Sequence, residues 1–264
     1  MTGSSELKSC CAAVYQSDFV RLLLGDSFHP GGLALTARLG GLLALEPDDH
    51  VLDVASGRGE SAIFLAQRFG CRITGIDLGA ANVAEANSRA EAAGVADLAR
   101  FELGDAEQIN HSGASFDAVL CECAFCTFPD KDTAAREFAR VLRPGGRLGL
   151  SDLTRSGALP PPLEGLLAWI ACIGDARTAA EYIAYLQRAG LHSLSVEPRD
   201  EALGQKVRDI QSRLLAAEMM VKLEKIHLPD VDFQEAKTVA ASAAEAIRSG
   251  LLGYSLITAT KPCQ

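Results

Sequence analysis

The stretch VLDVASGRG, Val51 to Gly59, decides how this chain folds. An apolar run leads directly into a glycine-containing turn, and a helical pattern, ESAIFLAQRFG, follows. This order is typical of the strand–turn–helix unit of α/β proteins. The turn is neither a GxGxxG fingerprint, because Ser61 and Ala62 stand where a third glycine would fall, nor a P-loop, because no GK[ST] follows. Glycines at the end of a strand nevertheless allow the backbone to approach a ligand closely.

The same alternation continues on the C-terminal side of this unit. The segments CRITGIDLG, ARFELGDAEQI, SFDAVLCECAF and RLGLSDL predict four more strands with helices between them, which indicates a parallel sheet covered on both faces. Beyond Asp152 we expect a helical segment starting at PPPLEG, a strand at HSLSVEP, helices over 200–249 with a break at HLPDVD, and a last strand, GYSLITATKP, inserted antiparallel in the edge region. The predicted divisions are a helical N-terminal cap (1–45), a cofactor-binding core (46–155), and a cover of the substrate cavity with a helical insertion and the last strands (156–264).

Composition limits the classes of partner that the chain can be expected to bind and indicates its cellular compartment. The chain has 264 residues and a net charge of -9, so we expect no nucleic-acid partner, because no basic stripe is present. No run of about 18 apolar residues predicts a membrane span. The start, MTGSSELKSCC, has no apolar signal core, which favours a cytoplasmic location. The eight cysteines are then expected to be reduced, and to be free, catalytic or metal-binding.

Acidic residues end three of the predicted strands: Asp53, Asp77 and Asp105. Together with the RPGG turn before RLGLSDL, they resemble the pattern of class I S-adenosylmethionine-dependent methyltransferases. The resemblance implies a Rossmann-like, mostly parallel seven-stranded sheet and S-adenosylmethionine as cofactor. The absent third glycine and the RPGG turn oppose a nicotinamide-binding domain. The residues that would bind the cofactor are Asp53, Ala55, Ser56, Gly57, Gly59, Asp77, Leu78, Asp105, Ala106 and Cys121.

The thiols are concentrated in three segments: LKSCC, CECAFCTFPDK and CIGDA. In this order they resemble the arsenite methyltransferases. That resemblance implies catalytic thiols that hold trivalent arsenic at Cys10 or Cys11, at Cys123 and at Cys172. Cys126 has no counterpart in that family and is an additional candidate ligand because it lies in the same segment as Cys123. Thiolates are soft ligands and suit such an element. The arsenic lone pair would attack the sulfonium methyl in line without a general base, and a thiol reductant would be the partner.

Several alternatives stay open at this point. The acceptor could be a small organic molecule with the cysteines as pocket lining, or the chain could bind a soft metal without catalysis. A zinc knuckle of Cys121, Cys123 and Cys126 would need a fourth ligand. His29, which precedes a proline, is interpreted as a turn residue rather than a base, and it could also line the pocket. The number of methyl groups added, the choice among thiophilic elements and the oligomeric state are not determined by the sequence.

Overall fold

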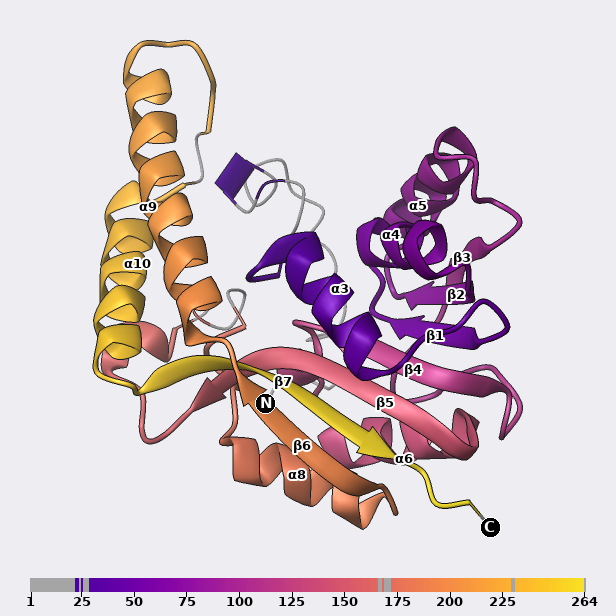
Figure 1. Ribbon diagram of the computed structural model, residues 1–264. Helices are drawn as coiled ribbons and strands as arrows, with labels where there is room; N and C mark the ends of the chain where they lie inside the picture. The colour runs from indigo at the N-terminus through magenta and orange to yellow at the C-terminus, as the bar shows by residue number, and fades with distance from the viewer. Residues whose placement is uncertain are drawn as a thin grey trace.

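The computed structural model describes residues 22, 23, 25, 29–165, 168, 172–228 and 231–263, and its centre is one seven-stranded sheet (Figure 1). The strand order is β3-β2-β1-β4-β5-β7-β6. Strands β1 to β5 pair in parallel, and β7 runs antiparallel to both β5 and β6. The predicted mostly parallel, seven-stranded sheet is therefore confirmed. The strands are β1 His50–Val54, β2 Arg72–Asp77, β3 Ala99–Leu103, β4 Phe116–Glu122, β5 Leu142–Arg155, β6 His192–Pro198 and β7 Leu252–Thr260.

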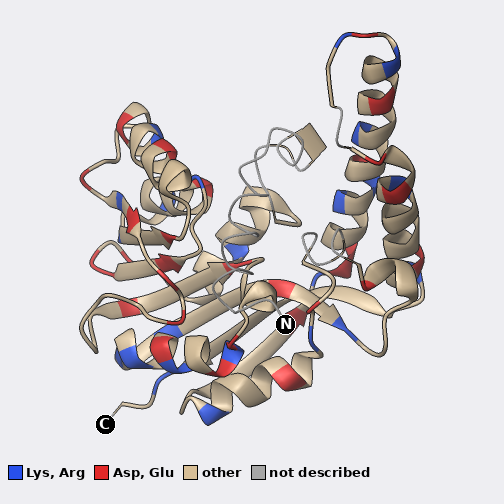
Figure 2. Ribbon diagram, turned by 180° about the vertical axis from the view of Figure 1, so that it is seen from behind, with Lys and Arg blue, Asp and Glu red and all other residues tan. Residues whose placement is uncertain are grey.

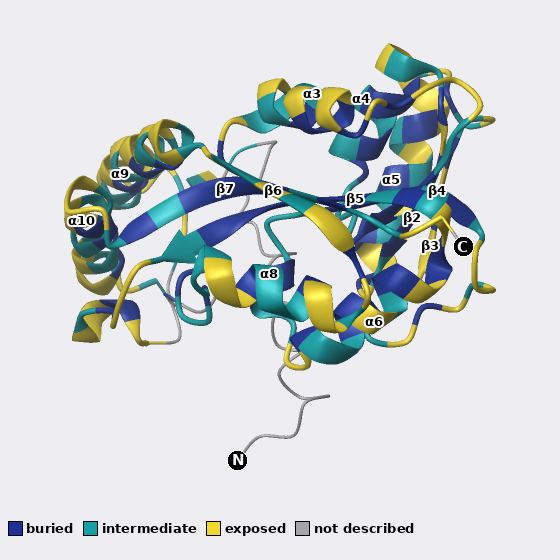
Figure 3. Cartoon of the chain, turned by 60° about the horizontal axis from the view of Figure 1, so that its bottom comes forward, coloured by how far each residue is buried: buried dark blue, intermediate teal, exposed yellow. Residues whose placement is uncertain are grey.

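Helices cover both faces of this sheet (Figure 3). Side chains of α3, α4 and α5 join β1, β2 and β3 in one apolar cluster, whereas α6 and α8 pack with β4 and β5 in a second, larger cluster. The near-continuous burial of β1 and β4 follows from having a helical layer on each side. The helices are α3 Gly32–Leu42, α4 Glu60–Phe69, α5 Ala80–Ala92, α6 Lys131–Val141, α8 Ala179–Arg188, α9 Asp200–Lys222 and α10 Phe233–Arg248, with short 3-10 turns at Phe125–Thr127 and Pro161–Leu163.

The long pair α9–α10 lies between β6 and β7 in the chain and stands at the end of the sheet where β5 finishes and β7 starts (Figure 1). Its turn falls at the predicted HLPDVD break, and Asp232 caps α10 by accepting a hydrogen bond from the Glu235 N–H group. The predicted helical insertion is confirmed. Of the predicted N-terminal cap, α3 is described, and the three-part division of the chain stays a prediction.

The last strand is inserted antiparallel in the edge region, as expected, because β7 lies between β5 and the edge strand β6. Two other expectations differ from the structure in detail. β5 begins before the RPGG turn, because Leu142 already pairs with Phe116 of β4. Of the helical segment expected from PPPLEG onward, the structure describes a 3-10 turn at Pro161–Leu163 and a helical conformation at Ala168.

Residues of both charge signs are spread over the molecule (Figure 2). Lys and Arg are scattered among Asp and Glu over the helices (Figure 2). Within the described ranges, no helix combines the length and the apolar character that crossing a bilayer requires.

Candidate active site

The turn between β1 and α4 has a shape that only particular residues allow. Gly59 has a φ of 77°, and a Cβ added there would stand 2.5 Å from the Phe101 ring, so glycine is required on two grounds. Gly57 has a φ of 53°, and a Cβ added there would meet nothing within 4 Å. Ala55 also lies in the left-handed region, at φ 58°, which is unusual for a residue with a side chain. The turn thus holds strained backbone beside open space.

Asp77, at the end of β2, fixes this turn from the neighbouring strand. One carboxylate oxygen accepts the Gly57 N–H group at 2.9 Å, and the other accepts the Gly79 N–H group at 2.8 Å and the Asn82 amide at 3.1 Å. The next side chain, Leu78, is 47% exposed, which is unusual for a large apolar residue at a strand end and suits contact with a ligand's flat apolar face. Asp105, after β3, accepts the Glu107 N–H group at 2.9 Å and so shapes its own loop.

Three carboxylates, from Asp53, Asp77 and Glu122, gather where β1, β2 and β4 end. Burial, and then the charges of Glu122 and Asp77, raise the pKa of Asp53 well above its ordinary value. Such a site gains from a positively charged ligand. S-adenosylmethionine carries a sulfonium and an ammonium group, and the buried Ser56 hydroxyl, which has no hydrogen-bond partner within the described residues, is a further polar group that a ligand could satisfy. The residues present fit this cofactor.

The cysteines after β4 and the one after β5 meet in space although they are far apart in the sequence. The Cys172 thiol donates a hydrogen bond to the Cys123 carbonyl oxygen at 3.4 Å, and the Cys172 side chain is close enough to the Cys123 and Cys126 thiols to raise the pKa of both. The Cys123 N–H group also donates a hydrogen bond to the Ser151 carbonyl oxygen of β5 at 2.6 Å. The thiols of Cys123, Cys126 and Cys172 therefore form one cluster beside the carboxyl ends of β4 and β5.

The backbone and the electrostatics of this cluster are both unusual. Cys123 and Cys172 have φ values of 53° and 62°, in the region that side chains rarely adopt. The hydrogen bond to Cys172 and burial raise the pKa of Cys123, and burial followed by the same partner raises the pKa of Cys126. Burial, and then Cys172, raise the pKa of Asp152 to about 7. The Asp152 carboxylate also accepts a hydrogen bond from the Cys126 N–H group at 2.9 Å. The Cys123 and Cys126 sulfurs are therefore protonated thiols at neutral pH.

These thiols do not complete a metal site by themselves. Among the residues that the structure describes, no three His, Cys, Asp or Glu side chains are arranged to hold a metal ion. The zinc alternative built on Cys121, Cys123 and Cys126 is thereby unsupported. Cys121 is fully buried in the large apolar cluster. Cys10 and Cys11, the predicted third ligand, lie outside the described residues.

A buried polar network adjoins the thiols, and sequence reasoning did not identify it. Glu122 accepts the Ser61 hydroxyl at 2.6 Å and the Thr36 hydroxyl at 3.0 Å, and His29 Nε2 lies 3.7 Å from the same carboxylate. His29 lies in a bend, as expected, and it is only 7% exposed. A charged residue ending the apolar run FDAVLCE was the available signal, since a carboxylate is rarely buried without partners.

Comparison with known proteins identifies the class. Residues 51–146 match the family described as "Methyltransferase domain". The chain is 34% identical over 262 residues to 27-O-demethylrifamycin SV methyltransferase of Amycolatopsis mediterranei (strain S699), covering 93% of this chain and 94% of that protein. It is 30% identical over 238 residues to an arsenite methyltransferase of Aquipseudomonas alcaligenes, covering 79% of this chain and 65% of that one. Phosphoethanolamine N-methyltransferase 2 of Haemonchus contortus, solved with S-adenosyl-L-methionine, has the same fold, with a TM-score of 0.80, 18% identity, and coverage of 97% of this chain and 60% of that one.

The fold and the site define a class I methyltransferase. The chain belongs to the S-adenosylmethionine-dependent methyltransferase family, and S-adenosylmethionine is its cofactor.

Proposed function

We propose that this methyltransferase transfers the methyl group to a trivalent thiophilic element, arsenite in the first instance, held by Cys123 and Cys172. The observation that carries the proposal is the meeting of these two thiols, from segments on either side of β5, next to the carboxylates of the cofactor site. The similarity to arsenite methyltransferases supports it. A third sulfur would come from Cys10 or Cys11, from Cys126, or from a carrier thiol.

Protonated thiols are suited to the binding step. Each cysteine that replaces a hydroxide on arsenite forms a sulfur–arsenic bond, and its proton leaves with the hydroxide as water. With a carrier thiol instead of hydroxide, the proton leaves on the released thiol. The raised pKa of Cys123 therefore does not obstruct binding, because no free thiolate has to persist in the buried cluster.

The bound cofactor supplies an electrophilic methyl group on a sulfonium. Arsenic held by sulfur keeps a lone pair, which forms the arsenic–carbon bond as the carbon–sulfur bond breaks and its electron pair returns to sulfur. The protein's task is to align donor and acceptor, and no proton has to be removed from arsenic. Arsenic becomes pentavalent in this step, so two electrons from a thiol reductant return it to the trivalent state.

The proposal is tested by incubating the protein with arsenite, excess glutathione and S-adenosylmethionine labelled in the methyl group. We expect labelled methylarsenic, measured by chromatography with mass detection. Cys123→Ser and Cys172→Ser should each lower the rate by roughly 100-fold or more, because a hydroxyl is a poor ligand for a soft element. Cys263→Ser is the matched control, since Cys263 is exposed near the C-terminus and should leave the rate unchanged.

A second candidate function is methylation of a hydroxyl group on an organic molecule. The buried network of Glu122, Ser61, Thr36 and His29 favours it, because a carboxylate beside a histidine could receive the proton of such a hydroxyl. The rifamycin methyltransferase, matched over almost the whole chain, supports it as well. Transfer to hydroxyl acceptors that is lost in Glu122→Gln and kept in Cys172→Ser would replace the arsenic proposal. Arsenic binding without any transfer would instead indicate a soft-metal binding protein.

A further inference from the structure

Glu122 ends β4 at the point where the strand order of the sheet reverses. The chain runs outward from β1 through β2 and β3, and then crosses to β4 on the other side of β1. In such sheets, ligands bind in the crevice outside the carboxyl ends of the strands at this reversal. Asp53 of β1 pairs with Leu120 of β4, two residues before Glu122. Glu122 also accepts a hydrogen bond from Ser61, two residues after Gly59 of the cofactor turn between β1 and α4, so it lies at the cofactor crevice.

The Glu122 carboxylate is held by hydroxyl groups from three elements and is almost completely buried, with its side chain 5% exposed. One oxygen accepts the Ser61 hydroxyl of α4 at 2.6 Å and the Thr36 hydroxyl of α3 at 3.0 Å. The other accepts the Ser151 hydroxyl of β5 at 3.4 Å, and Ser151 in turn accepts the Tyr254 hydroxyl at 2.9 Å. Hydroxyl groups donate hydrogen bonds but have no charge, so they orient the carboxylate and leave its negative charge uncompensated.

The charge of Glu122 is the one that a cation entering the crevice would meet. Among the ion pairs of the described residues, Glu122 has one partner, His29 at 3.7 Å, and an imidazole is positive only when it is protonated. Asp77 is engaged by the N–H groups that it accepts around the cofactor turn. Burial, and then the charge of Glu122, raise the pKa of Asp53, so Asp53 retains a proton more readily than an ordinary carboxyl group.

The cofactor changes its charge during the reaction. S-adenosylmethionine has a positive sulfonium, whereas S-adenosylhomocysteine, which remains after transfer, has a neutral thioether at the same atom. We propose that Glu122 is a specificity-determining residue that makes the cofactor crevice favour the sulfonium compound over its neutral product. The inference goes beyond the proposed function, because the cofactor loses this charge whichever acceptor takes the methyl group. It gives the buried hydroxyl network a task in exchanging product for fresh cofactor.

The test compares the binding of S-adenosylmethionine and S-adenosylhomocysteine to the full chain by calorimetry, with no acceptor present. The ratio of the two dissociation constants is used, so that effects on the ammonium, ribose and adenine groups that both ligands share cancel. Glu122→Gln should shift this ratio toward S-adenosylhomocysteine by about five- to tenfold, the size of one charge interaction in a partly buried site. Sinefungin, which has an ammonium group in place of the sulfonium, should lose affinity together with S-adenosylmethionine.

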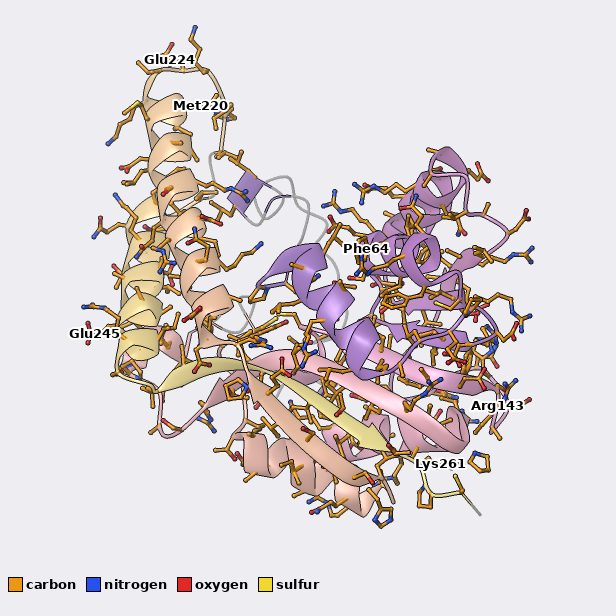
Figure 4. The ribbon with its side chains drawn as sticks, in the orientation of Figure 1. Phe64, Arg143, Met220, Glu224, Glu245 and Lys261 are labelled. Carbon is orange, nitrogen blue, oxygen red and sulfur yellow. The ribbon has the colours of Figure 1, made fainter. Side chains whose placement is uncertain are left out.

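Matched variants separate the charge of Glu122 from its hydrogen bonds. Glu122→Asp keeps the charge, and Thr36→Val removes only a hydroxyl donor, so both should retain the ratio of the unsubstituted protein. Glu245→Gln removes a carboxylate that is 65% exposed on α10 (Figure 4) and should change nothing.

An unchanged ratio in Glu122→Gln, with affinity for both ligands kept, lowered equally or lost, would overturn the inference, because the carboxylate would then only support the turn and α3. A shift of the same size in Thr36→Val would overturn it as well, because the hydrogen bonds and not the charge would then set the ratio. Since the experiment contains no acceptor, failure of the arsenic proposal would leave its result unaffected.

Discussion

Gly59 is the residue at which backbone and packing impose the strictest demand on the cofactor turn. Its positive φ and the 2.5 Å approach to Phe101 both exclude a side chain, whereas Gly57 in the same turn has open space around it. A residue with two independent requirements should be more sensitive to substitution than a glycine that has only one.

We therefore expect Gly59→Ala to destabilise the protein by about 2–5 kcal/mol, about 1–2 from the left-handed backbone and about 1–3 from overpacking against Phe101. Gly94→Ala is the control, because Gly94 has a φ of 69° and nothing within 4 Å of its added Cβ, so only the backbone cost of about 1–2 kcal/mol applies. Urea unfolding curves of the two variants measure the difference. Equal losses in both would show that Phe101 moves aside without cost.

Individual residues also show where sequence reasoning succeeds and where it ends. Asp53 and Asp77 could be assigned to one site, because carboxyl ends of parallel strands share one edge of a sheet. His29, Thr36 and Ser61 could not be assigned to Glu122, because their contacts depend on how α3 and α4 pack on the sheet. Likewise, the approach of Cys172 to Cys123 was expected from a family resemblance, since periodicity says nothing about contacts between distant loops.

Helix α6 is an element whose attachment depends on a charged pair. Glu137 accepts the Ile109 N–H group at 2.8 Å and the Arg140 guanidinium at 2.7 Å, and Arg140 donates to the carbonyl oxygens of Ile109 and His111. The pair thereby joins α6 to the loop between β3 and β4. The hydrogen bond from Arg140, together with the Ile109 N–H group, lowers the pKa of Glu137 despite its partial burial.

Because the pKa of Glu137 is lower in the folded chain, its contribution to stability is complete at neutral pH and disappears as the pH falls below the ordinary value of 4.5 and through the folded-state pKa. Glu137→Gln should lose about 1–2 kcal/mol of unfolding free energy at pH 7, and the gap to the unsubstituted protein should narrow below pH 4.5. Glu245→Gln, labelled in Figure 4, breaks a pair of the same spacing in which Glu245 and Arg248 are 65% and 73% exposed, and should have little effect at any pH. A gap that stays constant with pH would contradict the assignment.

At the scale of elements, the sequence predicted whether a segment forms a helix or a strand better than it predicted which strands lie next to each other. The apolar runs gave the strands, and the glycine and proline breaks gave the ends of most helices. The sequence placed the last strand in the edge region, but it did not show whether β6 or β7 pairs with β5. That choice is made by a tertiary contact, in which Arg147 to Arg155 pair with Thr260 to Leu252.

For the whole molecule, β7 is the strand on which the two halves of the chain depend. It pairs with both β5 and β6, and Tyr254, Leu256 and Ile257 are buried in it. Ending the chain at Leu251 should abolish cooperative thermal unfolding and leave the protein in the insoluble fraction. Ending it at Lys261 should change stability by less than about 0.5 kcal/mol, because β7 and the Gly145 N–H to Lys261 carbonyl bond are retained. A soluble, cooperatively unfolding chain that lacks β7 would show that β5 and β6 need no strand between them.

The position of β7 also sets the order of events on the ribosome. β5 is complete once Arg155 has been made, but its antiparallel partner is not translated until residues 252–260. Throughout that interval the nascent chain carries the parallel strands β1 to β5 with β5 at an open edge, which other nascent chains can pair with. Slower elongation over 156–251 would lengthen this exposure. Completion of the sheet therefore has to wait for residues 252–260, and the yield of folded enzyme depends on how well that edge is shielded in the meantime.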